Sequence, residues 1–437
     1  MRRLISSFMR RLTASPLIRN VMAVASGTVA GQAVVFAFSP LITRIYSPEA
    51  FGLQGVFLSL ISILSPAVGL RYPMAIVVAE TDTDARHLAR LSMLSAFVFS
   101  ALLGFVLLLA RRPVQMLLGV GSLGVLIWFL PLALFCGALQ DVADFRAARL
   151  GNFRLVGIVT VVQAFLTNLA RVLGGLVLPV AGTLMAVTSL APLAEAGLLN
   201  LDNRRRPDAS LRLRASEAMI LLRKHWDFPL YRVPTDMLNA ASQSVPVILL
   251  AALFSPAAAG LYTLTRSVLN LPSNVIGAAI GNVLYARFAD LARAGEPLMP
   301  LLSRTTWALL ALAPVLVGLA WFAPSFFAFI FGEKWREAGH YAQWMVLWIG
   351  LSIANVPAIR LAPVINGQVH LLIVNVVILA VRVLSMYVVY LMNGDAALAV
   401  SVFSLVSMAA NAGLIVVIAI ATRHHDNRIT KPVHAAA

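Results

Sequence analysis

The sequence predicts an all-α polytopic membrane protein of about twelve transmembrane helices, built as two parallel-repeat six-helix lobes. Composition is the first reason. Of the 437 residues 60% are hydrophobic and only 12% are charged, whereas soluble domains carry roughly twice that share of charge. Long apolar runs that do not alternate are the second reason, and an internal repeat is the third. Together they exclude an ordinary soluble domain and a transmembrane β-barrel.

The apolar runs define the individual elements. A backbone in lipid must satisfy its own hydrogen bonds, so each run of about 20 apolar residues is expected to be a helix. The predicted spans are residues 21–42, 53–79, 88–110, 114–139, 154–177, 179–199, 226–252, 258–285, 303–325, 341–365, 369–391 and 396–421.

An octapeptide recurs at close to half the chain length. Tyr46–Leu53 and Phe254–Leu261 share the pattern [YF]-S-P-x-A-x-G-L, 208 positions apart (254 minus 46). A repeat of this length in a hydrophobic chain indicates a transporter made of two similar helical bundles. Ser47 and Ser255 are predicted to cap helices that begin at the following proline, and the glycines allow close helix approach.

The distribution of basic residues predicts the orientation. With the N-terminus inside, 23 Arg and Lys lie in inner segments and five in outer ones, which predicts cytoplasmic termini. This asymmetry explains most of the net charge of +16 without a nucleic-acid partner. The predicted divisions are a basic segment at 1–20, lobes at 21–199 and 225–421, a basic linker at 200–224 and a tail at 422–437.

Six arginines remain inside the predicted spans. An arginine that faces lipid costs on the order of 2.5–3.5 kcal/mol, so each is expected to face a cavity or a partner. Snorkelling toward the headgroups is the alternative, and it applies first to Arg382 and Arg171. The other four are Arg71, Arg232, Arg266 and Arg360.

Polar stripes at helical spacing occur on three spans. Their members are Gln163, Thr167 and Arg171, then Arg232, Asp236, Asn239 and Gln243, then Arg266, Asn270 and Asn274. Hydrogen bonds between helices explain an isolated Asn or Gln, but stripes that include an arginine favour a water-filled cleft. The candidate substrate residues are Arg71, Arg171, Arg232, Asp236, Asn239, Gln243, Arg266, Asn270, Asn274 and Arg360.

Asp236 is the most deeply placed carboxylate on this topology. An ion pair with Arg232, one turn away, is favoured over a proton- or cation-sensitive gate. The D-x-D at Asp82 and Asp84 lies in a short loop and is interpreted as a solvated acidic turn. No catalytic residues, metal site or cofactor are predicted, and Cys136 is alone.

Several segments together resemble bacterial polysaccharide repeat-unit flippases of the Wzx type. In the first half they are Ser39–Gly52 and Arg71-Tyr72 with Ala75-Ile76; in the second half they are Asp227–Tyr231, Pro234, Leu238-Asn239, Ser242-Gln243, Pro246, Ala259–Tyr262, Arg266, Pro272 and Phe331–Tyr341. The resemblance covers most of residues 25–420. One departure is that Pro73 follows Arg71-Tyr72 where the family usually has Glu, so an ion pair at Arg71 needs another acid.

The resemblance implies membership of the multidrug/oligosaccharidyl-lipid/polysaccharide (MOP) exporter superfamily, with the lobes around a central cleft. It further implies transfer of an undecaprenyl-diphosphate-linked oligosaccharide from the inner to the outer leaflet of the bacterial cytoplasmic (inner) membrane for O-antigen, capsule or exopolysaccharide. Membrane lipids, a polysaccharide polymerase and a chain-length regulator are the partners it suggests. An arginine-lined cleft suits a diphosphate. The alternatives are a drug/cation antiporter of the same superfamily and a polytopic membrane enzyme of polysaccharide assembly.

Overall fold

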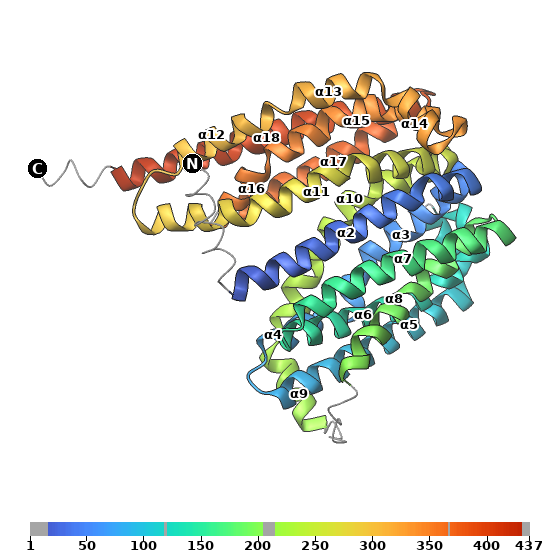
Figure 1. The fold of residues 1–437 in the computed structure, drawn as a ribbon, viewed down its shortest axis with the longest axis horizontal. Coiled ribbons are helices and arrows are strands. Elements are labelled where there is room, and N and C mark those ends of the chain that lie inside the picture. The colour runs from blue at the N-terminus through green and yellow to red at the C-terminus, as the bar shows by residue number, and fades with distance from the viewer. Residues whose placement is uncertain (1–15, 118–119, 204–214, 366–367, 431–437) are drawn as a thin grey trace, which may run out of the picture. The chain divides into compact units, whose positions relative to one another are not determined.

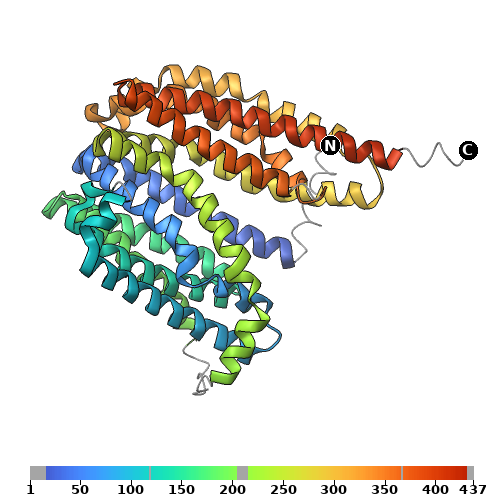
Figure 2. The ribbon, with the colours of Figure 1, turned by 180° about the vertical axis from the view of Figure 1, so that it is seen from behind.

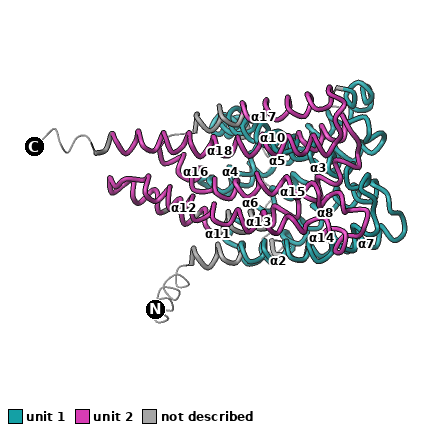
Figure 3. The backbone as a smooth tube through the Cα atoms, turned by 90° about the horizontal axis from the view of Figure 1, so that it is seen from above, with its two compact units in different colours: residues 1–244 teal, residues 245–437 magenta. Residues whose placement is uncertain are grey.

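A computed structural model describes residues 16–117, 120–203, 215–365 and 368–430. Every regular element in these ranges is helical. The chain divides into two compact units, residues 1–244 and 245–437, which Figure 3 colours teal and magenta. Each unit is described by itself below.

Unit 1 consists of helices that follow one another along the chain (Figure 1). They are α2 (Pro16–Ile45), α3 (Pro48–Val68), α4 (Tyr72–Val78), α5 (Asp82–Leu117), η1 (Gly121–Trp128), α6 (Phe129–Arg149), α7 (Phe153–Val177), α8 (Ala181–Asn203), α9 (Ala215–Lys224) and the π-helix η2 (Phe228–Arg232), followed by the first half of α10 (Val233–Leu253).

Unit 2 begins within α10 and contains the remaining helices, which Figure 2 shows from behind. They are α11 (Pro256–Arg293), α12 (Met299–Leu310), α13 (Ala313–Trp321), α14 (Ala323–Phe331), η3 (Glu333–Trp335), α15 (Arg336–Ala354), α16 (Val356–Leu361), α17 (Gln368–Leu391) and α18 (Ala396–Thr430).

The helices confirm the predicted fold class. Among the described residues, 10 helical segments are long and apolar enough to cross a membrane. They correspond to all the predicted spans except the eighth and the eleventh, which fall in the 38-residue α11 and the 24-residue α17. The protein is therefore a multi-pass α-helical membrane protein.

Among the predicted spans, three are interrupted just before a new helix that has proline in its first turn. The second, predicted over 53–79, ends at Val68, and the chain turns through Leu70 (φ 50°) and Arg71 (φ 57°) before α4 begins. The ninth breaks between α12 and α13, and the tenth breaks at Asn355 between α15 and α16. A proline stands in the first turn after each break, where its missing N–H does no harm.

Other helices continue beyond the predicted spans. The fourth span, predicted to end at 139, continues in α6 to Arg149, and α18 passes the predicted end at 421 and includes His424 and His425. Hydropathy detects only the apolar part of a helix, so it places the polar ends in loops.

The repeated octapeptide has the predicted structural role in both units. The Ser47 hydroxyl accepts a hydrogen bond from the Ala50 amide at 3.3 Å, and the Ser255 hydroxyl accepts one from the Ala258 amide at 3.1 Å. Each serine is the N-cap of a helix that starts with proline. The two copies are helix-start signals.

Helix packing also repeats between the units. In unit 1, α3 packs on α6, α6 on α8 and α7 on α8; in unit 2, α11 packs on α15, α15 on α18 and α17 on α18. The two sets of pairs match when α3 is equated with α11, α6 with α15, α7 with α17, and α8 with α18. Equivalent pairs in the same sequence order are what a parallel duplication predicts.

The division between the units falls within α10, after Ser244, whereas the predicted boundary is the linker at 200–224. The predicted linker begins inside α8 and ends in α9, and its middle lies outside the described residues. Most of the predicted N-terminal segment lies outside them too, whereas the predicted tail is described as far as Thr430, within α18. The start of α10 belongs to unit 1, and there Asp236 is ion-paired with Arg71.

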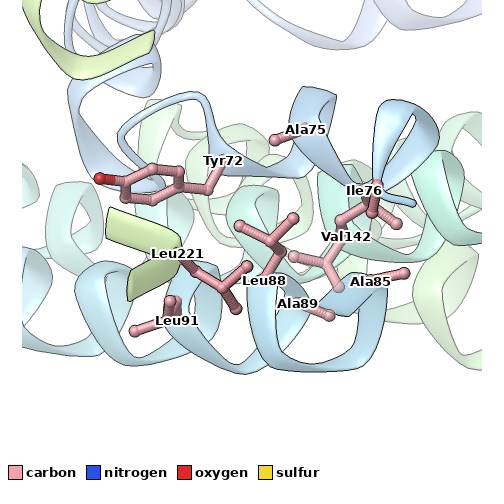
Figure 4. Packing of buried hydrophobic residues seen from close by; sticks show 10 residues of the cluster. Tyr72, Ala75, Ile76, Ala85, Leu88, Ala89, Leu91, Val142 and Leu221 are labelled. Carbon is pink, nitrogen blue, oxygen red and sulfur yellow. The ribbon is translucent and has the colours of Figure 1, made fainter. Parts of the chain in front are cut away.

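A buried hydrophobic cluster in unit 1 fixes α4 in place. Tyr72 and Ile76 of α4 pack with Leu88 of α5 and Val142 of α6, and Leu221 of α9 packs against the same cluster (Figure 4). Burial of these side chains stabilises a helix of only seven residues, which would not persist alone. The turn that carries Arg71 is thereby held against α5 and α6.

Gly27 provides a test of the packing between α2 and α7. A Cβ at Gly27 would overlap the Gly157 backbone, whereas a Cβ at Gly197 of α8 would meet nothing within 4 Å. We expect Gly27→Ala to lower the melting temperature of the purified protein, with overpacking of ~1–3 kcal/mol outweighing the helix propensity that alanine adds. The matched Gly197→Ala should leave it unchanged or raise it. Equal melting temperatures for the two variants would contradict this packing.

Candidate functional site

Arg71 is presented by an unusual backbone turn. It is the residue before α4 and adopts the left-handed conformation, with φ 57° and ψ 11°. Two consecutive non-glycine residues with positive φ are uncommon, and such strain is concentrated at functional sites.

Asp236 is shared by two arginines of unit 1. Its Oδ2 lies 2.8 Å from Arg71 Nε and 3.3 Å from Arg232 Nε. The side chains of Arg71 and Asp236 are 26% and 18% exposed, whereas that of Arg232 is 54% exposed. The predicted pair with Arg232 is confirmed, and Asp236 is the other acid that Arg71 requires in the absence of Glu at position 73. One carboxylate facing two guanidinium groups leaves one net positive charge.

A π-helical turn positions the second arginine. η2 covers Phe228–Arg232, and the Val233 amide donates to the Phe228 carbonyl, five residues back. Pro229 at the start of this turn has no amide hydrogen to donate. π-Helical turns inside α-helices are frequent at functional sites because they displace side chains from the ordinary helical register. This turn directly precedes the α10 residues that contain Asp236.

A small pocket lies beside Arg71. Residues of α3, of the turn after it, and of α4 and α6 line this pocket: Ser65, Gly69, Arg71, Pro73, Met74, Ala138, Asp141 and Phe145. Arg71 and Asp141 therefore face a common space from different elements. The pocket and the ion pairs at Asp236 together make the surroundings of Arg71 the candidate site of unit 1.

The structure also brings together carboxylates that the sequence analysis missed. Glu195 of α8 is 6% exposed and accepts a hydrogen bond from Gln140 Nε2 at 2.7 Å. On α6, Asp144 has a buried Oδ1 without a hydrogen-bond partner among the described residues. Glu195 is more buried than Asp236, whereas Asp236 lies nearer the middle of its predicted span. Glu195 lies inside the predicted sixth span, so its position was readable, whereas Asp144 was assigned to a loop.

Arg149 at the end of α6 stabilises the short helix next to Arg71. Its Nη1 donates to the carbonyl oxygens of Ile76 and Ala79, both at 2.8 Å, and its Nη2 lies 3.0 Å from Asp82 Oδ1. A guanidinium at the C-terminus of a helix satisfies free carbonyls and interacts favourably with the helix dipole. Arg149 therefore connects α6, the end of α4 and the start of α5.

The acidic turn before α5 has the expected surface character. The side chain of Asp82 is 87% exposed although it pairs with Arg149, and Glu80, 73% exposed, pairs with Lys224 of α9 at 2.8 Å. Among the described residues, no group of three or more His, Cys, Asp or Glu side chains is placed to hold a metal ion. The D-x-D is an ion-paired surface turn.

Arg171 does not snorkel as the alternative predicted. Its Nη2 donates to the Thr188 hydroxyl of α8 at 3.2 Å, its Nη1 lies 3.5 Å from Asn168 Oδ1, and the Tyr46 hydroxyl donates to its carbonyl at 2.8 Å. These contacts lie between α7, α8 and the end of α2. Arg171 crosslinks helices of unit 1 and has no described contact with Asp236.

The remaining candidate substrate residues of unit 1 are exposed. The candidate substrate residues of unit 2 lie on α11 and α16. Asn239 and Gln243 of α10 are exposed, while Arg266 and Asn270 of α11 are half-buried. The Asn274 side chain lies outside the described residues. Arg360 of α16 packs on α11, where its Nε would be 2.7 Å from a Cβ at Gly281.

Arg382 also contradicts the snorkelling expectation. Its Nε donates to the Ser407 hydroxyl at 2.9 Å, and its Cζ lies 5.5 Å from the Phe403 ring centroid and 5.9 Å from that of Trp348. The guanidinium group is therefore held between α15 and α18 inside unit 2. Arg382 was not among the predicted substrate residues, because the sequence pattern does not distinguish a buried arginine from one near the end of a span.

Two solved structures of membrane proteins have a similar arrangement of helices. The inward-facing conformation of a multidrug resistance MATE family transporter of the MOP superfamily aligns with a TM-score of 0.69 at 13% identity, over 93% of this chain and 96% of that chain. The lipid II flippase MurJ in an inward closed conformation aligns with a TM-score of 0.69 at 10% identity, over 91% and 90%. The protein thus shares the fold of these two transporter structures.

Sequence comparison gives the family. Residues 41–340 match the model of the polysaccharide biosynthesis protein family, and the chain belongs to that family. A relative is the succinoglycan biosynthesis transport protein ExoT of Rhizobium meliloti (strain 1021), which is 24% identical over 308 residues, 69% of this chain. That match spans 60% of the relative's length. The resemblance inferred from the motifs is confirmed.

Proposed function

We propose that this protein is a flippase that moves undecaprenyl-diphosphate-linked oligosaccharide repeat units from the inner to the outer leaflet of the bacterial cytoplasmic membrane. Membership of the polysaccharide biosynthesis family and the fold of the MOP transporters support this proposal. In this proposal both termini are cytoplasmic, and the repeat units supply a polymerase and a chain-length regulator for O-antigen, capsule or exopolysaccharide.

The arrangement of Arg71, Asp236 and Arg232 carries the proposal at the level of chemistry. Two guanidinium groups share one carboxylate, so one positive charge is available to an anion. Arg232 is the more exposed of the two and is the arginine that a phosphate would reach first. Guanidinium groups bind phosphate oxygens through charge-assisted, often bidentate hydrogen bonds, which suits a lipid diphosphate.

The same arrangement suggests how binding is coupled to conformational change. Asp236 neutralises Arg71 and Arg232 when no substrate is bound. A diphosphate that engages Arg232 competes with Asp236 for the same donors and weakens the link between α10 and the Arg71 turn. A ligand shifts a conformational equilibrium only through such a difference in interaction between states. Alternating access then follows from movement of α10 relative to α4.

A drug/cation antiporter remains the rival function, and the carboxylates of α6 and α8 are the observation that favours it. Antiport of organic cations needs acidic groups that bind the cation. The two functions differ in a measurable way, because an antiporter lowers the cellular accumulation of cationic dyes. We expect expression of this protein in an efflux-deficient host to leave dye accumulation unchanged.

The genetic test uses a strain that carries this gene. Deletion is expected to remove the surface polysaccharide and to cause lipid-linked repeat units to accumulate on the inner leaflet, since synthesis continues while translocation stops. Surface glycan is measured by lectin binding and the lipid-linked intermediate by extraction and mass spectrometry. Complementation with the wild-type gene is the control. A deletion strain that retains its polysaccharide and accumulates no intermediate would overturn the proposal.

A further inference from the structure

Arg382 lies among aromatic rings inside unit 2. Phe403 of α18 is central: its ring centroid lies 6.1 Å from that of Tyr262 and 6.2 Å from that of Trp348, with interplanar angles of 81° and 90°. The Arg382 Cζ lies 5.5 Å from the same ring. Rings of α15 and α18 thus flank the guanidinium group of Arg382 on α17, and Tyr262 of α11 packs on the same Phe403 ring. We call Tyr262, Trp348, Arg382 and Phe403 the aromatic cage.

No carboxylate of unit 2 is placed to neutralise Arg382. Unit 2 contains six acidic residues, all near helix ends: Asp290, Glu296, Glu333, Glu337, Asp395 and Asp426. The nearest in sequence to the cage, Asp395, caps α18 by accepting from the Leu398 amide at 2.7 Å. Along the axis of α18, Asp395 lies about 12 Å before Phe403, at a rise of 1.5 Å per residue. Asp426 accepts from the Leu298 and Met299 amides instead.

The cage also contains hydrogen-bond donors without acceptors. Trp348 Nε1 is buried and has no hydrogen-bond partner among the described residues. Tyr262 is only 1% exposed. Of the Arg382 donors, only Nε has a described partner, the Ser407 hydroxyl. Buried donors are normally paired, so this group of donors indicates a missing acceptor.

We propose that the aromatic cage binds a small inorganic anion of the size of chloride. An anion supplies the charge that Arg382 lacks and accepts from donors that otherwise remain free. Unpaired buried cations and donors are costly, so its binding energy would contribute to the stability of unit 2. A diphosphate-linked oligosaccharide is too large for a cage in which Tyr262 is almost fully buried. The site is independent of Asp236 and of the proposed transport substrate.

The test compares melting temperatures of the purified full-length protein in sodium chloride and in sodium gluconate at equal ionic strength. We expect chloride to raise the melting temperature in a saturable manner. Tyr262→Phe retains the ring and removes the hydroxyl donor, so it should weaken the apparent chloride affinity by at least about tenfold. Tyr387→Phe removes the hydroxyl of an exposed tyrosine on α17 and should leave the affinity unchanged.

Several outcomes would overturn the proposal. Equal melting temperatures in chloride and gluconate would show that no such anion binds. Chloride stabilisation that is unaffected by Tyr262→Phe would place the anion elsewhere. Stabilisation by pyrophosphate but not by chloride, lost in Tyr262→Phe, would contradict a chloride-sized site. If Tyr262→Phe does not fold, Trp348→Phe tests the indole donor in the same way.

Discussion

Asp236→Ala is expected to abolish surface polysaccharide in a complemented deletion strain. The change leaves Arg71, whose side chain is 26% exposed, beside Arg232 with no shared carboxylate. Removal of one partner of a buried ion pair costs ~3–5 kcal/mol, and partial exposure places this pair toward the lower end. Two adjacent uncompensated guanidinium groups also repel each other. Lectin binding to whole cells measures the polysaccharide, and immunoblotting measures the amount of protein in the membrane.

The variant Asp236→Glu is the conservative replacement for this prediction, and Glu80→Gln is its control. Asp236→Glu keeps the charge and should restore part of the polysaccharide. Glu80→Gln breaks an ion pair whose side chains are 73% and 44% exposed, and exposed pairs contribute only ~0–1 kcal/mol. It should behave like the wild type. Wild-type polysaccharide in cells with Asp236→Ala would exclude a transport role for the shared carboxylate.

Arg149→Ala is expected to lower the melting temperature of the purified protein more than any other single arginine replacement in unit 1. It removes hydrogen bonds to the Ile76 and Ala79 carbonyls and an ion pair with Asp82. Hydrogen bonds to charged groups are worth about 1.5–3 kcal/mol each, and the freed carbonyls lie at a partly buried helix end. Loss of these contacts releases the end of α4.

The matched control for Arg149→Ala is Arg293→Ala. Arg293 also ends a helix and pairs with Asp290 at 2.8 Å, but its side chain is 78% exposed. Its replacement should change the melting temperature little. Arg149→Lys should be only a partial rescue, because one ammonium group does not reproduce the fork of the guanidinium. Equal melting temperatures for Arg149→Ala and Arg293→Ala would refute the role assigned to Arg149.

Much of the fold follows from the sequence because the membrane imposes a simple pattern. Apolar runs gave the spans, and Ser47 and Ser255 marked the starts of equivalent helices in the two units. The breaks were harder to predict. Pro73, Pro314 and Pro357 each begin a new helix, yet prolines also occur inside the continuous helices α3, α8 and α10. Local sequence does not separate these cases, since neighbouring helices decide whether the freed backbone groups are satisfied.

The site was predictable only in part, for a similar reason. The pair of Arg232 with Asp236 is local, at helical spacing on one face. The pair of Arg71 with Asp236 joins residues far apart in the sequence and depends on a left-handed turn. Arg382 was not predictable for the same reason. The residues of its aromatic cage come from four helices, and no residue spacing in the sequence predicts that arrangement.

The most direct test of the proposed flippase function is lipid translocation in proteoliposomes. The purified protein is reconstituted with a polyprenyl-diphosphate-linked oligosaccharide whose terminal sugar is labelled enzymatically from outside. Wild-type protein should make nearly all of the lipid-linked sugar accessible to the enzyme, whereas protein-free liposomes and Asp236→Ala should expose only the outer half. Wild-type vesicles that stay at the protein-free level, with the protein verified as folded, would contradict the account.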